Sequence, residues 1–344
     1  TQLKFKRNIQ MALHHLSHAA SAFYPSPFSN AAILTVDGVG EWATATIGVG
    51  TGNEIKLIKE MNYPHSVGLL YSAFTYYTGF KVNDGEYKLM GLAPYGDPEY
   101  VDLIKKEIVH INDDGSILLN MDYFDFRESP GMITSKFESL FGGPARKSSE
   151  NITKKTRDIA KSIQVVTEEI VIKMARHVQQ ITGARNLCMA GGVALNCVAN
   201  GKILEEKIFD NIWIQPSAGD AGGAVGAALG YYYSKKNAVK RRDGICLQKG
   251  SLFGPGFSDD EVKAYLDSFG FKYSQLTAAE RNKTVAAYLA DGKIVGHFNG
   301  RTEFGPRALG NRSILGDPRS ETAQSSLNLK IKFRESFRPF APSV

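Results

Sequence analysis

The chain of 344 residues is 43% hydrophobic and 22% charged, which is typical of a folded globular protein and excludes a largely disordered one. No apolar run approaches the roughly 18 to 20 residues that a membrane span needs, and no basic and then apolar leader opens the sequence, so we expect a cytoplasmic protein. The net charge of +6 would suit nucleic acid, but its placement among glycines and prolines near the end of the chain favours small anions.

The first expected element is a helix over residues 11–23, "MALHHLSHAASAF". His14 and His18 lie one turn apart on the same face of this helix, where two imidazoles can bind one metal ion. The spacing alone leaves a structural role open, because each histidine could simply satisfy one hydrogen bond in the core. The zinc-peptidase pattern H-E-x-x-H is excluded, because position 15 is also histidine and no carboxylate lies between the pair.

Three strands are expected over residues 31–61, joined by tight turns as a meander rich in Ile, Val and Thr. The first turn, Asp37 to Gly40, carries an acid directly after a strand. Helical spacing follows over residues 66–80, and a long amphipathic helical segment covers 150–183 and closes at Gly183.

Two units of strand, turn and helix come next, over residues 186–204 and 211–233. The first turns at Gly191 and Gly192, and in the second Asp220 precedes a helix made almost entirely of Gly and Ala. Glycines at such turns let the backbone approach a ligand, and the following helix N-terminus offers free N–H groups to an anion. The pair of units predicts an α/β nucleotide-binding domain.

A charged segment containing Gly and Pro, residues 234–258, interrupts the periodicity, and we expect a domain boundary near residue 245. Two helices, over 258–270 with Ser258 as its N-cap and over 279–292, and a strand over 293–300 should follow it. The next segment, "NGRTEFGPRALGNRSILGDPRS" (299–320), interleaves arginines with glycines, which is the composition of a phosphate- or carboxylate-binding pocket. A merely basic surface is the alternative interpretation.

The residue types of a divalent metal site are present in His14, His18, Asp37 and Asp220. Two imidazoles and two carboxylates suit iron(II), manganese or zinc. The sequence alone does not establish that the four side chains converge.

Seven ordered motifs identify a resemblance that runs over nearly the whole chain. They resemble the NodU/CmcH family of O-carbamoyltransferases, which implies an α/β protein with two domains. Residues 1–244 would form a domain of the actin and sugar-kinase (ASKHA) type, similar to the tRNA threonylcarbamoyladenosine synthase, and residues 245–344 a YrdC-like domain. Family members extend beyond both ends of this chain, so we expect the first domain to lack its N-terminal part, and a general base with it, and the second its C-terminal part, which leaves activity open. The motifs are "HHLSHAASAF", "TVDGVGEWATATI", "GEYKLMGLAPYGDP", "MAGGVALNCVANGKI", "QPSAGDAGGAVGAAL", "GRTEFGPRALGNRSIL" and "KIKFRESFRPFAPSV".

The resemblance implies a reaction in two steps. Carbamoyl phosphate and ATP, with Mg, would give carbamoyladenylate, and the carbamoyl group would then pass to a hydroxyl of a sugar, an antibiotic or a nodulation-factor-like molecule. The resemblance also implies site residues. Metal ligands would be His14, His18, Asp37 and Asp220, with iron(II) as the ion; nucleotide-binding residues Gly191, Gly192, Val193, Asn196 and Lys332; catalytic residues Arg301, Arg307, Lys330 and Arg334.

Other functions are weighed beside this one. A carbamoyl- or threonylcarbamoyl-transfer protein of hydrogenase maturation or tRNA modification would share the domain pair, and a catalytically inactive nucleotide-binding scaffold would keep only the fold. We expect no membrane or nucleic-acid partner, and a homodimer is left open.

Overall fold

The computed structural model describes residues 9–127, 131–235, 238–239 and 243–341. The last three residues of the final sequence motif therefore lie outside the described part. The chain divides into an N-terminal unit, Thr1–Leu247, and a C-terminal unit, Gln248–Val344. Both contain helices and strands, so the expected mixed α/β class is confirmed. Within the described ranges, no helix combines the length and the apolar character needed to cross a membrane.

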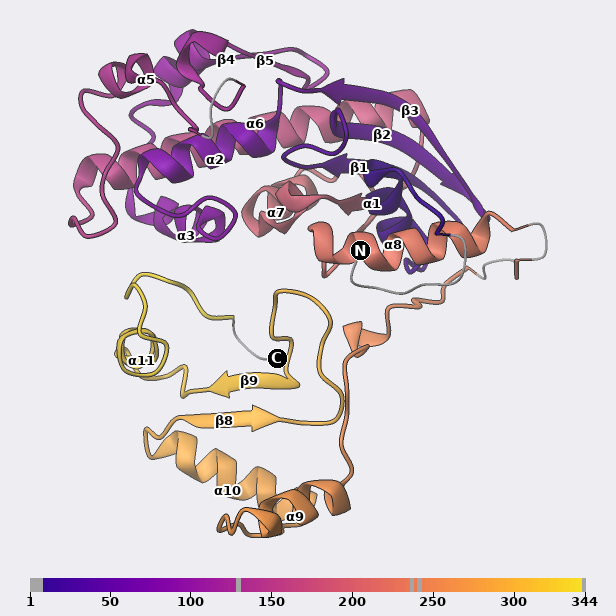
Figure 1. The fold of residues 1–344 in the computed structure, drawn as a ribbon, viewed down its shortest axis with the longest axis vertical. Coiled ribbons are helices and arrows are strands. Elements are labelled where there is room, and N and C mark those ends of the chain that lie inside the picture. Colours follow the sequence, from indigo (N-terminus) through magenta and orange to yellow (C-terminus); the bar gives the residue numbers. More distant parts are fainter. Residues whose placement is uncertain (1–8, 128–130, 236–237, 240–242, 342–344) are drawn as a thin grey trace. The chain divides into compact units, whose positions relative to one another are not determined.

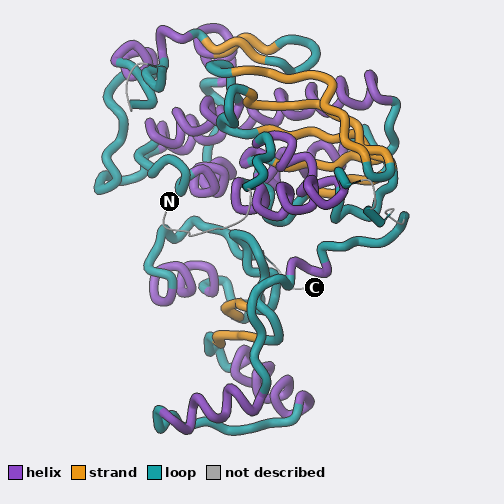
Figure 2. Tube along the Cα trace, turned by 45° about the vertical axis from the view of Figure 1, so that its right-hand side comes forward, coloured by secondary structure: helices purple, strands orange, loops and turns teal. Residues whose placement is uncertain are grey.

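A five-stranded sheet forms the centre of the N-terminal unit. Its strands are β1 (Asn30–Val36), β2 (Ala43–Thr51), β3 (Glu54–Asn62), β6 (Asn186–Ala190) and β7 (Asn211–Ile214). They lie side by side in the order β3-β2-β1-β6-β7 (Figures 1 and 2). The first three pair antiparallel, which confirms the expected meander, whereas β6 runs parallel to β1 and β7 parallel to β6. Because parallel strands end at the same edge of a sheet, the turns that follow β1 and β6 meet there.

Helices cover both faces of this sheet. On one face, α1 (His14–Phe23) and α8 (Asp220–Tyr233) enclose a core that includes Ile33 of β1 and Phe23 of α1. On the other face, Leu34 of β1 lies beside Met174 of α6 (Lys154–Thr182), and both line one small cavity. The alternation of neighbouring residues between two apolar layers accounts for the continuous burial of β1 from Ala31 to Val36. The remaining elements of this unit are α2 (Val67–Tyr77), α3 (Glu86–Leu92), α4 (Val101–Leu103), β4 (Val109–Ile111), β5 (Ile117–Leu119), α5 (Ser135–Leu140) and α7 (Cys197–Glu205).

Residues at both ends of α6, a helix of 29 residues, determine where it begins and ends. Thr153 and Thr156 form a capping box at its N-terminus, and Gly183 ends it in the left-handed region at φ 60°. The expected helical segment over 150–183 is therefore confirmed as one helix.

The composition of α8 is explained by its packing against α1. A Cβ added at Gly226 would lie 1.8 Å from the carbonyl oxygen of Ser17 in α1. Only a residue without a side chain lets the two helix backbones approach this closely.

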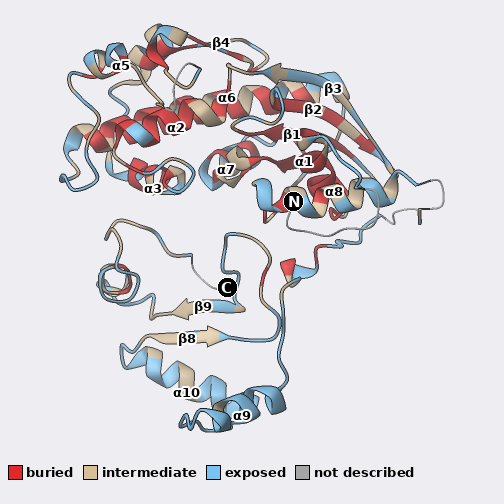
Figure 3. Ribbon diagram, in the orientation of Figure 1, coloured by how far each residue is buried: buried red, intermediate tan, exposed pale blue. Residues whose placement is uncertain are grey.

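The C-terminal unit is built from small elements. They are α9 (Asp259–Ser268), α10 (Ala278–Ala290), β8 (Val295–Phe298), β9 (Arg312–Leu315) and α11 (Ala323–Ser326). Ser258 caps α9 in a capping box with Glu261, as the sequence predicts. Neither α9 nor α10 buries a residue, whereas most residues of α1 and β1 and about half of those of α6 are buried (Figure 3).

Candidate metal centre

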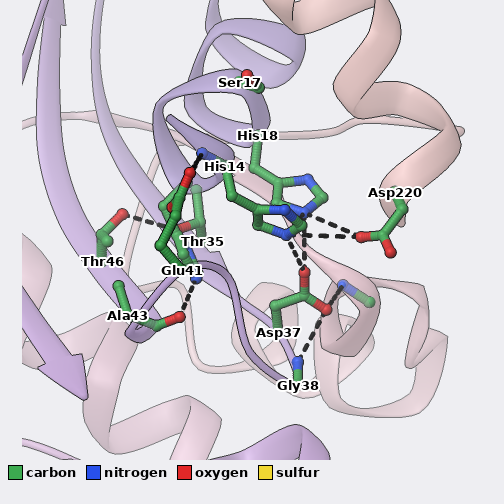
Figure 4. A network of polar contacts seen from close by, with 12 residues as sticks. His14, Ser17, His18, Thr35, Asp37, Gly38, Glu41, Ala43, Thr46 and Asp220 are labelled. Carbon is green, nitrogen blue, oxygen red and sulfur yellow. Dashed lines mark hydrogen bonds and ion pairs between the residues drawn. The ribbon is translucent and has the colours of Figure 1, made fainter. Parts of the chain in front are cut away.

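Asp37 stands at the centre of the candidate site, directly after β1. One carboxylate oxygen, Oδ1, accepts hydrogen bonds from the backbone N–H groups of Gly38 at 2.8 Å and Gly192 at 3.0 Å. The other oxygen, Oδ2, is thereby turned toward the histidines of α1 (Figure 4). The carboxylate is buried and held in one orientation.

His14 and His18 both direct Nε2 at this oxygen. The distances from Asp37 Oδ2 are 2.9 Å to His14 and 2.8 Å to His18, and the two Nε2 atoms lie 3.0 Å apart. The helical spacing expected from the sequence therefore brings both imidazoles to one point. The N-terminus of α1 is held by Glu41, whose carboxylate accepts the His14 backbone N–H at 3.0 Å.

Asp220, the first residue of α8, completes the cluster from the exposed side. Its Oδ1 lies 3.5 Å from His14 Nε2 and 3.6 Å from His18 Nε2, and its side chain is 81% exposed. One ligand atom from each of the four residues lies within 4.8 Å of every other. Two ligands about 2.1 Å from one ion, at roughly 90 to 110° to each other, would lie about 3.0 to 3.4 Å apart. The separations given above, 2.8 to 3.6 Å, lie within about 0.2 Å of this range, and the donor set suits a divalent ion.

The electrostatics of the cluster suit a cation. The hydrogen bond to Asp37 raises the pKa of His14 against the effect of burial. Burial opposes ionisation of Asp37, but the bonds from His14 and His18 outweigh it and hold the pKa of this carboxyl well below its usual range. Asp37 thus carries a full negative charge beside two imidazoles. His18 Nδ1 is buried and has no hydrogen-bond partner among the described residues.

His15 has a different task. Its Nε2 donates to the carbonyl oxygen of Ala43 at 2.8 Å, and its Nδ1 accepts from the Thr35 hydroxyl at 2.7 Å. Burial lowers the pKa of His15 to about 4, so the ring is neutral at physiological pH. Both ring nitrogens are used within the fold, so His15 has no ring nitrogen available for a metal ion.

An open cavity of about 320 Å³ adjoins the metal cluster. It reaches the two ligand imidazoles and the carboxylate of Asp220 and gives small molecules access to the site. Its lining residues are Ala12, His14, Ser17, His18, Glu41, Asp220 and Gly223.

The expected nucleotide-binding turn lies directly beside the metal cluster. A short 3-10 turn covers Gly192–Leu195, and the Asn196 side chain caps α7 by accepting the N–H of Ala199. Most backbone N–H groups of the turn already have partners within the protein. Gly191 donates to Ala218, Gly192 to Asp37, Ala194 to Gly191 and Asn196 to Val193.

The expected phosphate-binding cations lie in the C-terminal unit, apart from the metal ligands in the chain. Arg301 donates to the carbonyl oxygens of Gly254 at 2.9 Å and Phe253 at 3.4 Å. Arg334 donates to the Asn328 side chain at 2.6 Å. The exposed residues are Arg301, Arg307, Lys330 and Lys332, while Arg334 is half-buried.

Three residues of structural importance were not singled out from the sequence. Glu41 caps the helix that carries both histidines, Gln164 of α6 binds Asn196, and the buried Glu303 accepts the N–H groups of Leu309 and Asn311 in the arginine segment. Glu41 and Glu303 lie inside the quoted motifs. Their hydrogen-bond partners depend on how the chain folds back on itself, and the periodicity of the sequence does not identify them.

Fold and site together define an α/β protein with a candidate His/Asp metal centre. The chain belongs to the carbamoyltransferase family. The family model described as carbamoyltransferase N-terminus matches residues 1–229, and that described as carbamoyltransferase C-terminus matches residues 286–344. The resemblance recognised in the sequence is thereby confirmed.

Similar proteins include two that are named as nodulation proteins. Nodulation protein NolNO of Sinorhizobium fredii is 40% identical over 98% of this chain and 47% of its own length. Nodulation protein NolO of Bradyrhizobium diazoefficiens is 36% identical over 96% of this chain and 58% of its own. An uncharacterized Synechocystis protein, sll1178, is 55% identical over 96% of this chain and 54% of its own. The chain spans about half the length of these curated relatives.

Among solved structures, this chain is similar to full-length HypF in a phosphate- and nucleotide-bound form. The match covers 69% of this chain and 45% of the HypF chain, with 14% sequence identity and a TM-score of 0.37. HypF of T. kodakarensis matches 63% of this chain over 36% of its own, with 13% identity and a TM-score of 0.34. We draw no conclusion about function from likenesses this weak.

Proposed function

We propose that this chain is part of an ATP-dependent O-carbamoyltransferase with a metal-dependent transfer site in the N-terminal unit. The observation that carries the proposal is the convergence of His14, His18, Asp37 and Asp220 beside an open cavity, in a chain that belongs to the carbamoyltransferase family. The acceptor that we propose, from the family resemblance, is a hydroxyl of a sugar, an antibiotic or a nodulation-factor-like molecule. Two of the relatives are named as nodulation proteins.

The proposed ion is iron(II), which the family resemblance implies; two imidazoles and two carboxylates would equally suit manganese or zinc. When bound, it would supply a positive charge that polarises a carbonyl oxygen. The residues of the chain provide the geometry. Asp37 holds one oxygen toward both histidines, and Asp220 adds a second charge from the cavity side. Because AMP is already a good leaving group, carbamoyl transfer from an adenylate depends mainly on how the reacting groups are positioned.

For the first step we propose that water hydrolyses carbamoyl phosphate to carbamate and phosphate. A carbamate oxygen then attacks the α-phosphate of ATP, which forms carbamoyladenylate and releases pyrophosphate. Arg301, Arg307, Lys330, Lys332 and Arg334 are the cations proposed to neutralise the phosphate groups. The C-terminal unit would then correspond to the YrdC-like domain and the N-terminal unit to the ASKHA-type domain. The sheet, in which parallel strands extend an antiparallel meander between two helix layers, supports an architecture of nucleotide-binding type. Location in the cytoplasm and the oligomeric state stay predictions.

The metal assignment is tested by iron content. The chain is loaded anaerobically with Fe(II), desalted and assayed for bound iron, beside His14→Ala, His18→Ala and a matched control, His110→Ala. His110 is exposed on β4 and lies outside the cluster. We expect about one iron per chain in the parent and the control and a loss of at least tenfold in affinity in the two ligand variants. Equal iron in all four proteins would refute the assignment.

The reaction is tested by exchange of labelled pyrophosphate into ATP that depends on carbamoyl phosphate. Exchange in the parent that falls at least tenfold in Arg301→Ala and Arg307→Ala would support both the first step and the role of the arginines. Exchange that survives in both variants would refute the role of the arginines. A parent that binds iron but supports no exchange would favour the inactive scaffold.

A further inference from the structure

The turn after β6 holds the segments of both carboxylate ligands. Gly192 donates its N–H to Asp37 Oδ1 at 3.0 Å, and Gly191 donates its N–H to the carbonyl oxygen of Ala218 at 2.8 Å, two residues before Asp220. The two carboxylates come from distant parts of the sequence, and this turn touches both segments. Its position therefore determines where the acidic half of the metal cluster lies.

The turn leaves no space for a side chain at its two glycines. Gly191 has φ +94°, and a Cβ added there would lie 2.2 Å from the carbonyl oxygen of Val36. A Cβ at Gly192 would lie 2.9 Å from Asp37 Oδ1 itself. The backbone of the turn therefore lies directly against β1 and Asp37, and the hydrogen bond from Gly192 couples the position of the turn to that of the carboxylate.

The other end of the turn is held by two buried amides that bind each other. Gln164 of α6 donates Nε2–H to Asn196 Oδ1 at 3.1 Å, and Asn196 returns Nδ2–H to Gln164 Oε1 at 3.0 Å. Asn196 Oδ1 also accepts the N–H of Ala199 at 3.1 Å. Because a backbone N–H can only donate, this third bond identifies the oxygen of Asn196 and hence the orientation of both amides.

Gln164 is saturated with hydrogen bonds. Its Oε1 also accepts the Tyr71 hydroxyl at 3.0 Å, and its Nε2 also donates to Glu168 at 2.9 Å, so both protons and both lone pairs are used. Burial raises the pKa of Tyr71, which keeps the hydroxyl protonated as a donor. Gln164 is only 2% exposed and Asn196 9%, so water cannot readily replace these partners. The amide pair thus joins α2 and α6 to the turn.

We propose that Gln164 is a positioning residue of the metal centre: through Asn196 it holds the Gly191–Asn196 turn, and through Gly192 the turn holds Asp37 with Oδ2 toward the histidines. This inference rests on the proposed metal-dependent function. It also assigns Asn196 to the support of the site rather than to contact with the nucleotide.

The test measures Co(II) binding and its visible absorption spectrum, which reports coordination geometry, in the full chain well below its melting temperature. Gln164→Leu removes every hydrogen bond of the amide at similar volume. Asn196→Ser keeps a capping oxygen for α7 but is too short to reach Gln164. We expect both variants to bind Co(II) about three- to tenfold more weakly with an altered spectrum, at the low end of the effect of residues that orient metal ligands.

The matched control is Gln180→Leu, the same substitution at an exposed position of α6, which should reproduce the affinity and spectrum of the parent. If Gln164→Leu does not fold, Asn196→Ser carries the test. Parent-like affinity and spectrum in a folded Gln164→Leu or Asn196→Ser variant would overturn this inference alone. A parent chain that binds no Co(II) would overturn the inference and the proposed metal centre together.

Discussion

Asp37 is the residue on which the site depends, because its two oxygens have separate tasks. Oδ1 is engaged by the N–H groups of Gly38 and Gly192, which leaves Oδ2 for the two histidines. A metal ligand whose second oxygen is held by backbone amides loses little freedom when the ion binds. The glycine at position 192 is needed for this arrangement, since any side chain there would contact the carboxylate.

Gly192→Ala should therefore weaken Co(II) binding about tenfold or more, because the new methyl group displaces Asp37 Oδ1. Isothermal titration with Co(II) measures the effect. The matched control is Gly201→Ala in α7, where nothing lies within 4 Å of the added Cβ; it should keep the affinity and gain up to about 1 kcal/mol of stability from helix propensity. An unchanged affinity in Gly192→Ala would contradict the role given to this contact.

At the scale of elements, the position of Asp220 depends on how closely α8 packs against α1. Gly226 faces the Ser17 carbonyl of α1, whereas Gly223, on the same helix, has open space around its Cβ position. The Gly-rich composition of α8 thus serves helix packing at Gly226, and it brings the first residue of α8 near the histidines of α1.

We expect Gly226→Ala to lower the free energy of unfolding by about 1–3 kcal/mol, as overpacking does, and to weaken Co(II) binding by moving Asp220 away from α1. Gly223→Ala is the control for stability only, because Gly223 borders the cavity, and it should keep the free energy of unfolding of the parent. Urea unfolding of the two variants and Co(II) titration of Gly226→Ala check these expectations. If Gly226→Ala and Gly223→Ala have the same free energy of unfolding, α1 and α8 do not pack as closely as described.

A second element, α6, holds a loop through a buried carboxylate. Asp158 accepts the Asp97 backbone N–H at 2.9 Å and the Lys154 ammonium at 2.7 Å. Burial opposes ionisation of Asp158, but these two donors outweigh it and lower its pKa. Because the pKa is lower in the folded than in the unfolded chain, this carboxylate stabilises the fold above its ordinary pKa of about 3.9, and the stabilisation is lost as the pH falls through the folded pKa.

Asp158→Asn should consequently lower the free energy of unfolding by about 1.5–3 kcal/mol at pH 7, and the difference from the parent should shrink below about pH 4. Urea unfolding between pH 3 and 7 measures both effects. The exposed Asp102→Asn is the control and should follow the parent across this range. A difference that stays constant with pH would mean that the charge of Asp158 does not matter.

At the scale of the whole molecule, the proposed chemistry is divided between the two units. All four proposed metal ligands and the glycine turn belong to the N-terminal unit, while the proposed phosphate-binding cations belong to the C-terminal unit. The N-terminal unit has a continuous core between two helix layers, whereas α9 and α10 of the C-terminal unit bury no residue. The two units should therefore differ in stability as well as in function.

Residues 1–247 expressed alone should bind Co(II) with the same affinity as the full chain, because the ligands and their support lie within that unit. Residues 248–344 alone should show no cooperative thermal transition, because too little apolar surface is buried to offset the conformational entropy of the chain. Titration and circular dichroism check the two fragments. Loss of Co(II) binding in the first, or a sharp transition in the second, would contradict this division.

The sequence by itself determined the local features. The spacing of His14 and His18, the extent of α6 up to Gly183 and the capping of α9 by Ser258 depend on contacts within a few residues. The meander over 31–61 depends on pairing between strands that follow one another in the chain. Each of these agrees with the structure. The ordered motifs likewise sufficed to recognise the carbamoyltransferase family.

Only the tertiary structure decided which side chains share one point in space. The pairing of β1 with β6 brings Gly192 to Asp37, and the packing of α8 on α1 brings Asp220 to the histidines. The tertiary structure also gives His15 a different role from its neighbour His14, because His15 Nε2 donates to the carbonyl oxygen of Ala43. These contacts join residues far apart in the chain, and their geometry depends on strand order and helix packing, which local periodicity does not encode.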